Sequence, residues 1–368
     1  MRPSFPRPER RRWPGHTVCP SIPKLRQGGT AMTDFVQFPE HVFEQAGNVF
    51  IGFDGGASQH AVANARSLMW FAQLAYEVDN TGANPDAAAK VDRIRSIWKF
   101  EPVTQFRGHT IEIGSIYDTT GLFGERADAV VLAFAGTDLG VWETVATDAD
   151  FKADNDDVHA GFHKAANAVM DKVDAAIELS RQRGKPLFIA GHSLGAAIGI
   201  LAARHAAEAR NHPPRAVYGF GTPRVGGATF QKGYDALLGD VTYRHVHGRD
   251  LVARVPMSFL GYRHVGHVLQ IPTNGKFASG RMSPDRSNEP DFTLDTLINT
   301  LSVLDPFKVA QLLGRIAAGE VRIPEDAPRA LANLLPAPGH GVIGQTFRLS
   351  PLAIREHLQD SYLAAFAP

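Results

Sequence analysis

Ser193 lies in the segment GHSLG, and its surroundings suit a serine that acts as a nucleophile. Four apolar residues, 187–190, precede this segment, and a run rich in Ala, Ile and Leu follows it. We expect a buried strand that turns directly into a helix, with the helix N-terminus pointing at the serine hydroxyl. Gly191 and Gly195 would let the strand and the helix approach each other closely. The chemistry available to such a serine is acyl transfer, in which its oxygen attacks a carbonyl carbon.

A nucleophilic serine needs partners from elsewhere in the chain. It needs a base for its proton, an acid that orients the base, and N–H donors for the oxygen that becomes negative. The base must be a histidine, because imidazole can both take and return a proton near neutral pH. An ionised carboxylate then fixes the histidine tautomer and stabilises the imidazolium. The pentapeptide alone is a weak signal until these partners are found.

The elements that would position these groups alternate between strands and helices along the chain. Apolar strands separated by helices indicate a layered α/β sheet that is buried on both faces. Active residues collect at the carboxyl ends of the strands in such sheets. The predicted elements are a helix over 57–78, a strand over 109–118, an apolar strand within 124–138, an amphipathic helix over 156–183 closed by Gly184, the strand and helix around Ser193, strands within 216–227 and 241–256, and a final helix over 351–366.

The composition is that of an ordinary globular protein with one large domain or two modest ones. The 368 residues are 44% hydrophobic, and 38 Lys and Arg balance 38 Asp and Glu. No apolar run approaches the roughly 18 residues that a transmembrane helix requires. Residues 1–32 hold seven basic residues against Glu9, so the remainder carries 31 basic against 37 acidic residues. A mildly acidic body argues against nucleic acid as a partner.

Residues 1–32 are expected to be a disordered, basic, Pro-rich tail outside the fold. They contain six prolines and lack the apolar core of a secretory signal. A transit-like segment and an upstream extension before a start at Met32 are the alternatives. The compartment stays open, either cytoplasmic or reached by another export route. Cys19 is the single cysteine, so residues 33–368 can form neither a disulfide nor a thiolate metal site.

Several separate motifs, in matching order, resemble those of the fungal-type (class 3) lipases of the α/β-hydrolase superfamily. The resemblance covers about residues 60–270 and the last turns of the chain. It implies an α/β-hydrolase fold over 33–368, with a mostly parallel central sheet, helices on both faces and a C-terminal helical insertion. Ala135 departs from the pattern, because the family usually has arginine there. The motifs are LAFAGTD at 132–138, VHAGF at 158–162, GHSLG, YGFGTPRVGG at 218–227 and RDLVARVP at 249–256.

The resemblance implies a role for each matching position. Ser193 matches the nucleophile and Asp250 matches the acid of the triad. His357, in REHLQDSYL, matches the late histidine that is followed by a tyrosine and serves as the base. Thr137 and Leu194 match the two positions that line the oxyanion hole.

Other residues compete for the acid and base positions. His264 is the main rival of His357, because it lies 14 residues after Asp250, beyond a loop. Asp240, Asp148 and Asp150 are weaker rivals of Asp250, since a loop aspartate usually caps a helix or stays solvated.

Two segments could cover the site. Residues 139–151 match a short lid, whose apolar side chains would face a lipid–water interface, although Trp142 could instead pack on the sheet. Residues 272–346 contain an amphipathic block and are predicted to be either a packed helical insertion or a cap over the site. The lid residues expected to meet the interface are Leu139, Val141, Trp142 and Val145.

Together these features predict a carboxylic ester hydrolase that acts on lipid esters, as a triacylglycerol lipase or esterase, through an acyl-enzyme. The resemblance implies no metal and no organic cofactor. Its expected partners are a lipid or ester substrate and a lipid–water interface. The alternatives are a catalytically silent lipase-like binding or signalling module, and an acyltransferase or phospholipase on the same scaffold. Acyl-chain length and oligomeric state stay open.

Overall fold

The computed structural model describes residues 37–78, 86–101, 103–112, 115–136, 154, 156–250, 252–256, 258, 261–283 and 356–367. Several predictions fall outside these residues. They concern the tail 1–32, the oxyanion residue Thr137, the rival acids Asp148 and Asp150, the lid residues Leu139, Val141, Trp142 and Val145, and positions 284–346 of the predicted insertion.

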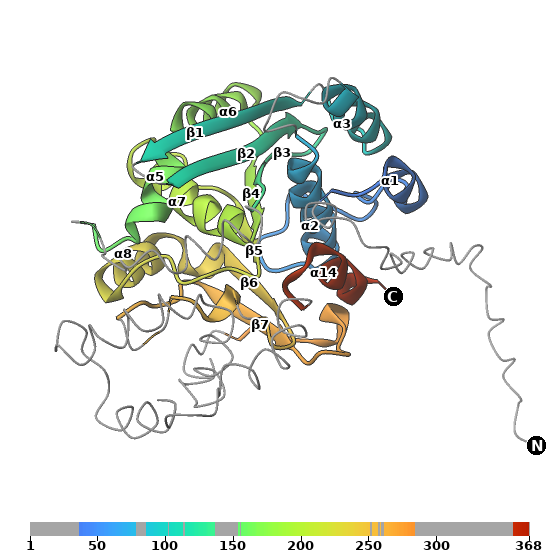
Figure 1. The fold of residues 1–368 in the computed structure, drawn as a ribbon. Coiled ribbons are helices and arrows are strands. Elements are labelled where there is room, and N and C mark those ends of the chain that lie inside the picture. Colours follow the sequence, from blue (N-terminus) through green and yellow to red (C-terminus); the bar gives the residue numbers. More distant parts are fainter. Residues whose placement is uncertain are drawn as a thin grey trace, which may run out of the picture.

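One seven-stranded sheet runs through the described residues (Figure 1). The strands lie in chain order, β1 to β7. The first three pair antiparallel, and every later neighbour pairs parallel, as predicted for a mostly parallel sheet. The strands are β1 Thr104–Glu112, β2 Ser115–Glu125, β3 Val130–Phe134, β4 Leu187–His192, β5 Ala216–Phe220, β6 Thr242–His247 and β7 His267–Ile271.

Helices cover both faces of this sheet (Figure 1). One apolar cluster joins α1, α2, α3 and α14 to one face, and a second joins α5, α6, α7 and α8 to the other. The helices are α1 Glu40–Ala46, α2 Val62–Tyr76, α3 Asp86–Ile97, α5 Ala160–Asn167, α6 Met170–Arg183, α7 Leu194–Glu208, α8 Ala228–Leu238 and α14 Gln359–Phe366, with short 3-10 turns η2 Gly239–Val241, η3 Val252–Arg254 and η5 Phe277–Ser279.

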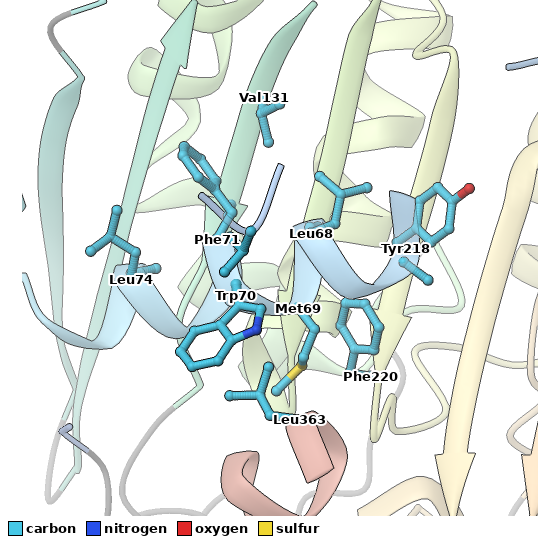
Figure 2. Packing of buried hydrophobic residues seen from close by; sticks show 14 of the residues in the cluster. Leu68, Met69, Trp70, Phe71, Leu74, Val131, Tyr218, Phe220 and Leu363 are labelled. Atoms are coloured by element: carbon cyan, nitrogen blue, oxygen red, sulfur yellow. The ribbon is translucent and has the colours of Figure 1, made fainter. Parts of the chain in front are cut away.

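Helix α2 is buried along most of its length and fixes the position of the C-terminal helix. Figure 2 shows Leu68 and Phe71 among the side chains that lie between α2 and the sheet, and Leu363 of α14 beside Met69. Each of these large side chains contributes about 1.5–3 kcal/mol when fully buried. The same packing holds α14, and the residues just before it, against the carboxyl ends of the central strands.

Two predicted elements are each divided in the structure. The predicted strand over 109–118 belongs to an antiparallel pair, β1 and β2, in which Glu112 faces Ser115. The predicted helix over 156–183 is two helices, α5 and α6, although it does end at Gly184 with φ +62°. The break between them packs against β1, where a Cβ on Gly108 would lie 2.4 Å from the carbonyl oxygen of Ala168. In the predicted final helix over 351–366, Glu356 and His357 are helical, Leu358 is a bend and α14 spans Gln359–Phe366, while 351–355 lie outside the described residues.

Candidate active site

Ser193 occupies the turn between β4 and α7, as its flanking sequence predicts. Its backbone has φ +59° and ψ −131°, a conformation that non-glycine residues rarely adopt and that marks stored strain. Its backbone N–H donates to the carbonyl of Phe220 at 2.9 Å, which ties the turn to the neighbouring strand β5. A Cβ on Gly191 would lie 2.2 Å from the carbonyl oxygen of Gly195, so this turn needs glycine at 191.

Asp250 and His357, 107 residues apart, meet next to this turn. Asp250 follows β6 and His357 precedes α14. The His357 Nδ1 lies 2.9 Å and 3.0 Å from the two carboxylate oxygens of Asp250. Both residues are at most 2% exposed. The Nδ1–H therefore donates to the carboxylate, and Nε2 is the ring nitrogen left to exchange a proton.

The Asp250 carboxylate is held in its ionised form by several donors. Its Oδ1 accepts the backbone N–H of Val252 at 2.9 Å, and its Oδ2 accepts the hydroxyl of Tyr362 at 2.5 Å. Burial acts to raise the pKa of Asp250, but the charge of His357 and the hydrogen bonds from His357 and Tyr362 outweigh it, so the pKa is lowered. This side chain can therefore stabilise a positively charged imidazole beside it.

Gly221, just after β5, leaves room for this pair. Its φ is +59°, and its backbone N–H donates to the carbonyl of His245 at 3.0 Å. A Cβ on Gly221 would lie 2.7 Å from Asp250 Oδ2 and 2.8 Å from His357 Nδ1. No side chain fits between the backbone of Gly221 and the acid–base pair.

The end of strand β3 also reaches the serine. A Cβ on Gly136 would lie 2.7 Å from the Cβ of Ser193, so this backbone is in close contact with the turn. Thr137 follows directly in the sequence, outside the described residues. Leu194, the other predicted oxyanion residue, is the first residue of α7 and is 2% exposed. Ala135, which replaces the usual arginine, is 3% exposed within an apolar cluster.

The rival acids and bases lie in other settings. His264 Nε2–H donates to the backbone carbonyl of Ala253 at 2.8 Å, which braces the loop after Asp250. Burial, and then the nearby charges of Arg244 and Arg224, hold the pKa of His264 well below its usual range. Asp240, in contrast, has a fully exposed side chain.

Three side chains around the pair were not predicted from the sequence. Tyr362 donates to Asp250. The only sequence signal for this contact is the family pattern in which a tyrosine follows the late histidine. Tyr76, on α2, contacts Nδ1 of His192 through its hydroxyl. Glu356 is 2% exposed, and its Oε2 accepts the backbone N–H of Arg249 at 2.7 Å. It thereby joins the turn before Asp250 to the segment that carries His357.

Within the described residues, no three His, Cys, Asp or Glu side chains gather as metal ligands would. In the same part of the chain, no helix has both the length and the hydropathy needed to cross a bilayer.

Comparison with known proteins finds lipases both by sequence and by structure. The sequence profile of the family described as lipase (class 3) matches residues 132–260. The secreted mono- and diacylglycerol lipase LIP1 of Malassezia globosa is 34% identical over 130 residues, which are 35% of this chain and 42% of that protein. The secreted mono- and diacylglycerol lipase A of Penicillium cyclopium is 32% identical over 161 residues, which are 41% of this chain and 51% of that protein. The chain thus spans about half, or less, of the length of these relatives.

A solved structure supports the fold. The mono- and diacylglycerol lipase of Aspergillus oryzae superimposes with a TM-score of 0.50 at 21% identity, covering 68% of this chain and 94% of that one. The predicted α/β-hydrolase fold is thereby confirmed.

Proposed function

We propose that the chain is a fungal-type class 3 lipase that hydrolyses carboxylic esters of lipids through an acyl-enzyme on Ser193, because residues 132–260 match the lipase (class 3) family. Asp250 and His357 supply the acid and the base. The observation that carries this proposal is the buried pair that they form beside the strained serine turn.

The reaction has two halves. In the first, Ser193 Oγ attacks the ester carbonyl carbon while His357 Nε2 takes the hydroxyl proton. The tetrahedral intermediate then collapses, the bond to the alcohol breaks, and the imidazolium returns the proton to the leaving oxygen. In the second half, water gives its proton to His357 and attacks the acyl-enzyme, releasing the carboxylic acid and restoring Ser193. Asp250 stabilises the imidazolium in both halves.

The intermediate carries its negative charge on one oxygen, which backbone N–H groups must stabilise. Leu194, at the start of α7, and Thr137 are the proposed donors, and the helix N-terminus adds its dipole. Loss of one such donor typically costs about 2.7–4 kcal/mol of barrier height. The close approach of Gly136 to Ser193 supports this placement of Thr137, since Thr137 is the next residue.

The proposed substrates are acylglycerols. The two relatives described above carry the name mono- and diacylglycerol lipase, and the family model that matches residues 132–260 includes Ser193 and Asp250. A role as a silent binding module is less well supported, because such a module has no need for a buried, fully hydrogen-bonded acid–base pair.

The test is hydrolysis of p-nitrophenyl esters of C2 to C16 acids, followed by mono-, di- and triacylglycerol emulsions. Ser193→Ala and His357→Ala should each lose activity by about 10³-fold or more, as triad deletions do. The matched controls are Ser96→Ala, an exposed serine of α3, and His205→Ala, a partly exposed histidine of α7. An inactive wild-type protein, or an active Ser193→Ala variant, would overturn the proposal. Transfer to added alcohol that outruns hydrolysis would instead indicate an acyltransferase.

A further inference from the structure

We propose that His192, the residue before the nucleophile, is a positioning residue that fixes the base by holding its main-chain carbonyl. Tyr76 sets the tautomer in which His192 does this. The inference rests on the role proposed above for His357.

The contacts of His192 allow one arrangement of its protons. Its Nε2 lies 2.7 Å from the carbonyl oxygen of His357, and its Nδ1 lies 2.7 Å from the hydroxyl oxygen of Tyr76. A carbonyl oxygen can only accept, so Nε2 must carry the hydrogen. In the neutral ring Nδ1 is then an acceptor, and the Tyr76 hydroxyl donates to it.

The neutral state of His192 follows from its surroundings. The side chain is 2% exposed, and its ring stacks on that of His357 with centroids 4.6 Å apart at 28°. Burial, followed by the nearby charge of His357, lowers the pKa of His192 to about 3. When His357 becomes an imidazolium during the reaction, His192 therefore adds no second positive charge beside it.

This contact completes the anchoring of the base. The His357 side chain is held at Nδ1 by Asp250, and its main chain is held by His192. With both ends fixed, the ring plane and the direction of Nε2 are determined. His192 is adjacent to Ser193 on the chain, so one short segment sets the positions of both the nucleophile and the base.

Tyr76 extends the arrangement toward the oxyanion side. Its hydroxyl oxygen also accepts the backbone N–H of Gly136 and the side-chain amide of Gln359. It therefore links the strand that leads to Thr137, the serine turn and the segment after His357. A shift of about 1 Å in such a group can cost about 10²-fold in rate.

The test compares His192→Gln with His192→Asn in the full-length protein. The two amides have the same chemistry, but the longer glutamine places its N–H where Nε2–H was, whereas the asparagine N–H lies near the former Nδ1. We expect His192→Gln to keep kcat for p-nitrophenyl butyrate within about 5-fold of wild type, and His192→Asn to lose about 10- to 100-fold, both with KM within about 3-fold. Circular dichroism and thermal melting measure how much of each variant is folded.

The two proposals fail in distinguishable ways. Equal kcat values per folded enzyme for His192→Gln and His192→Asn would overturn the positioning role, even if Ser193→Ala is inactive. A change confined to KM would overturn it as well. If the wild-type protein does not hydrolyse esters, the proposed function itself is wrong. Tyr76→Phe, which leaves Nδ1 without its donor, should show a kcat loss between those of the two His192 variants.

Discussion

Replacing Gly221 with alanine should disable the proposed acid–base pair without removing any side chain from it. The new Cβ would lie 2.7 Å from Asp250 Oδ2 and 2.8 Å from both Cε1 and Nδ1 of His357. Neither neighbour can move away easily, because Asp250 is held by Tyr362 and His357 by His192. Alanine must also adopt φ +59°, which costs about 1–2 kcal/mol, and overpacking adds about 1–3 kcal/mol.

We therefore expect Gly221→Ala to lower the free energy of unfolding by about 2–5 kcal/mol. We also expect it to lower kcat by about 10²- to 10⁴-fold. The lower limit is the typical loss when a catalytic group is misplaced by about 1 Å, and the upper limit is the typical loss when the catalytic histidine is in the wrong tautomer. Urea unfolding measures the first effect, and hydrolysis of p-nitrophenyl butyrate by folded enzyme measures the second.

Gly184→Ala provides the matched control. Gly184 has φ +62°, and a Cβ there would meet nothing within 4 Å. It should lose about 1–2 kcal/mol of stability from the backbone alone and keep its full activity. A Gly221→Ala variant with kcat within about 3-fold of wild type would refute the reasoning, because then the contact with the pair does not limit the reaction.

Two further perturbations test the electrostatics of the buried groups. Tyr362→Phe removes the hydroxyl that donates to buried Asp250, so the free energy of unfolding should fall by about 1–3 kcal/mol and kcat by about 10-fold; an unchanged urea midpoint would contradict this. The second perturbation is pH. His192 is protonated below about pH 6.5 in the unfolded chain but only near pH 3 in the folded protein, because burial lowers its pKa to about 3. The free energy of unfolding must therefore fall as the pH decreases from about 6.5 to about 3. His192→Gln should make the fall between pH 6 and pH 4 shallower by about 1.4 kcal/mol per pH unit than in wild type, measured in the same series of urea titrations, and an unchanged slope would contradict this.

The serine turn could be predicted because its signals are local. The apolar residues before Ser193, the helix-forming run after it and the two flanking glycines all lie within some twenty residues. The mostly parallel sheet with two covered faces likewise follows from apolar strands that alternate with helices. The hairpin of β1 and β2 was missed, because a continuous alternating pattern does not show where a chain reverses.

The acid and the base that assist Ser193 could not be predicted from local sequence signals. Asp250 and His357 are 107 residues apart, and only the resemblance to a family selected His357 over His264. The structure brings His357 to Asp250 and places His264 against the carbonyl of Ala253. The contact of Tyr76 with His192 depends on how α2 crosses the sheet, which is a matter of tertiary packing and has no local pattern.

The most direct measurement of the central claim is covalent labelling with a fluorophosphonate, followed by mass spectrometry of the intact protein and of its peptides. We predict one adduct per chain, on Ser193, formed at neutral pH and lost in both Ser193→Ala and His357→Ala. An adduct on another residue, or labelling of Ser193 that persists at the wild-type rate in His357→Ala, would contradict the proposed nucleophile and base.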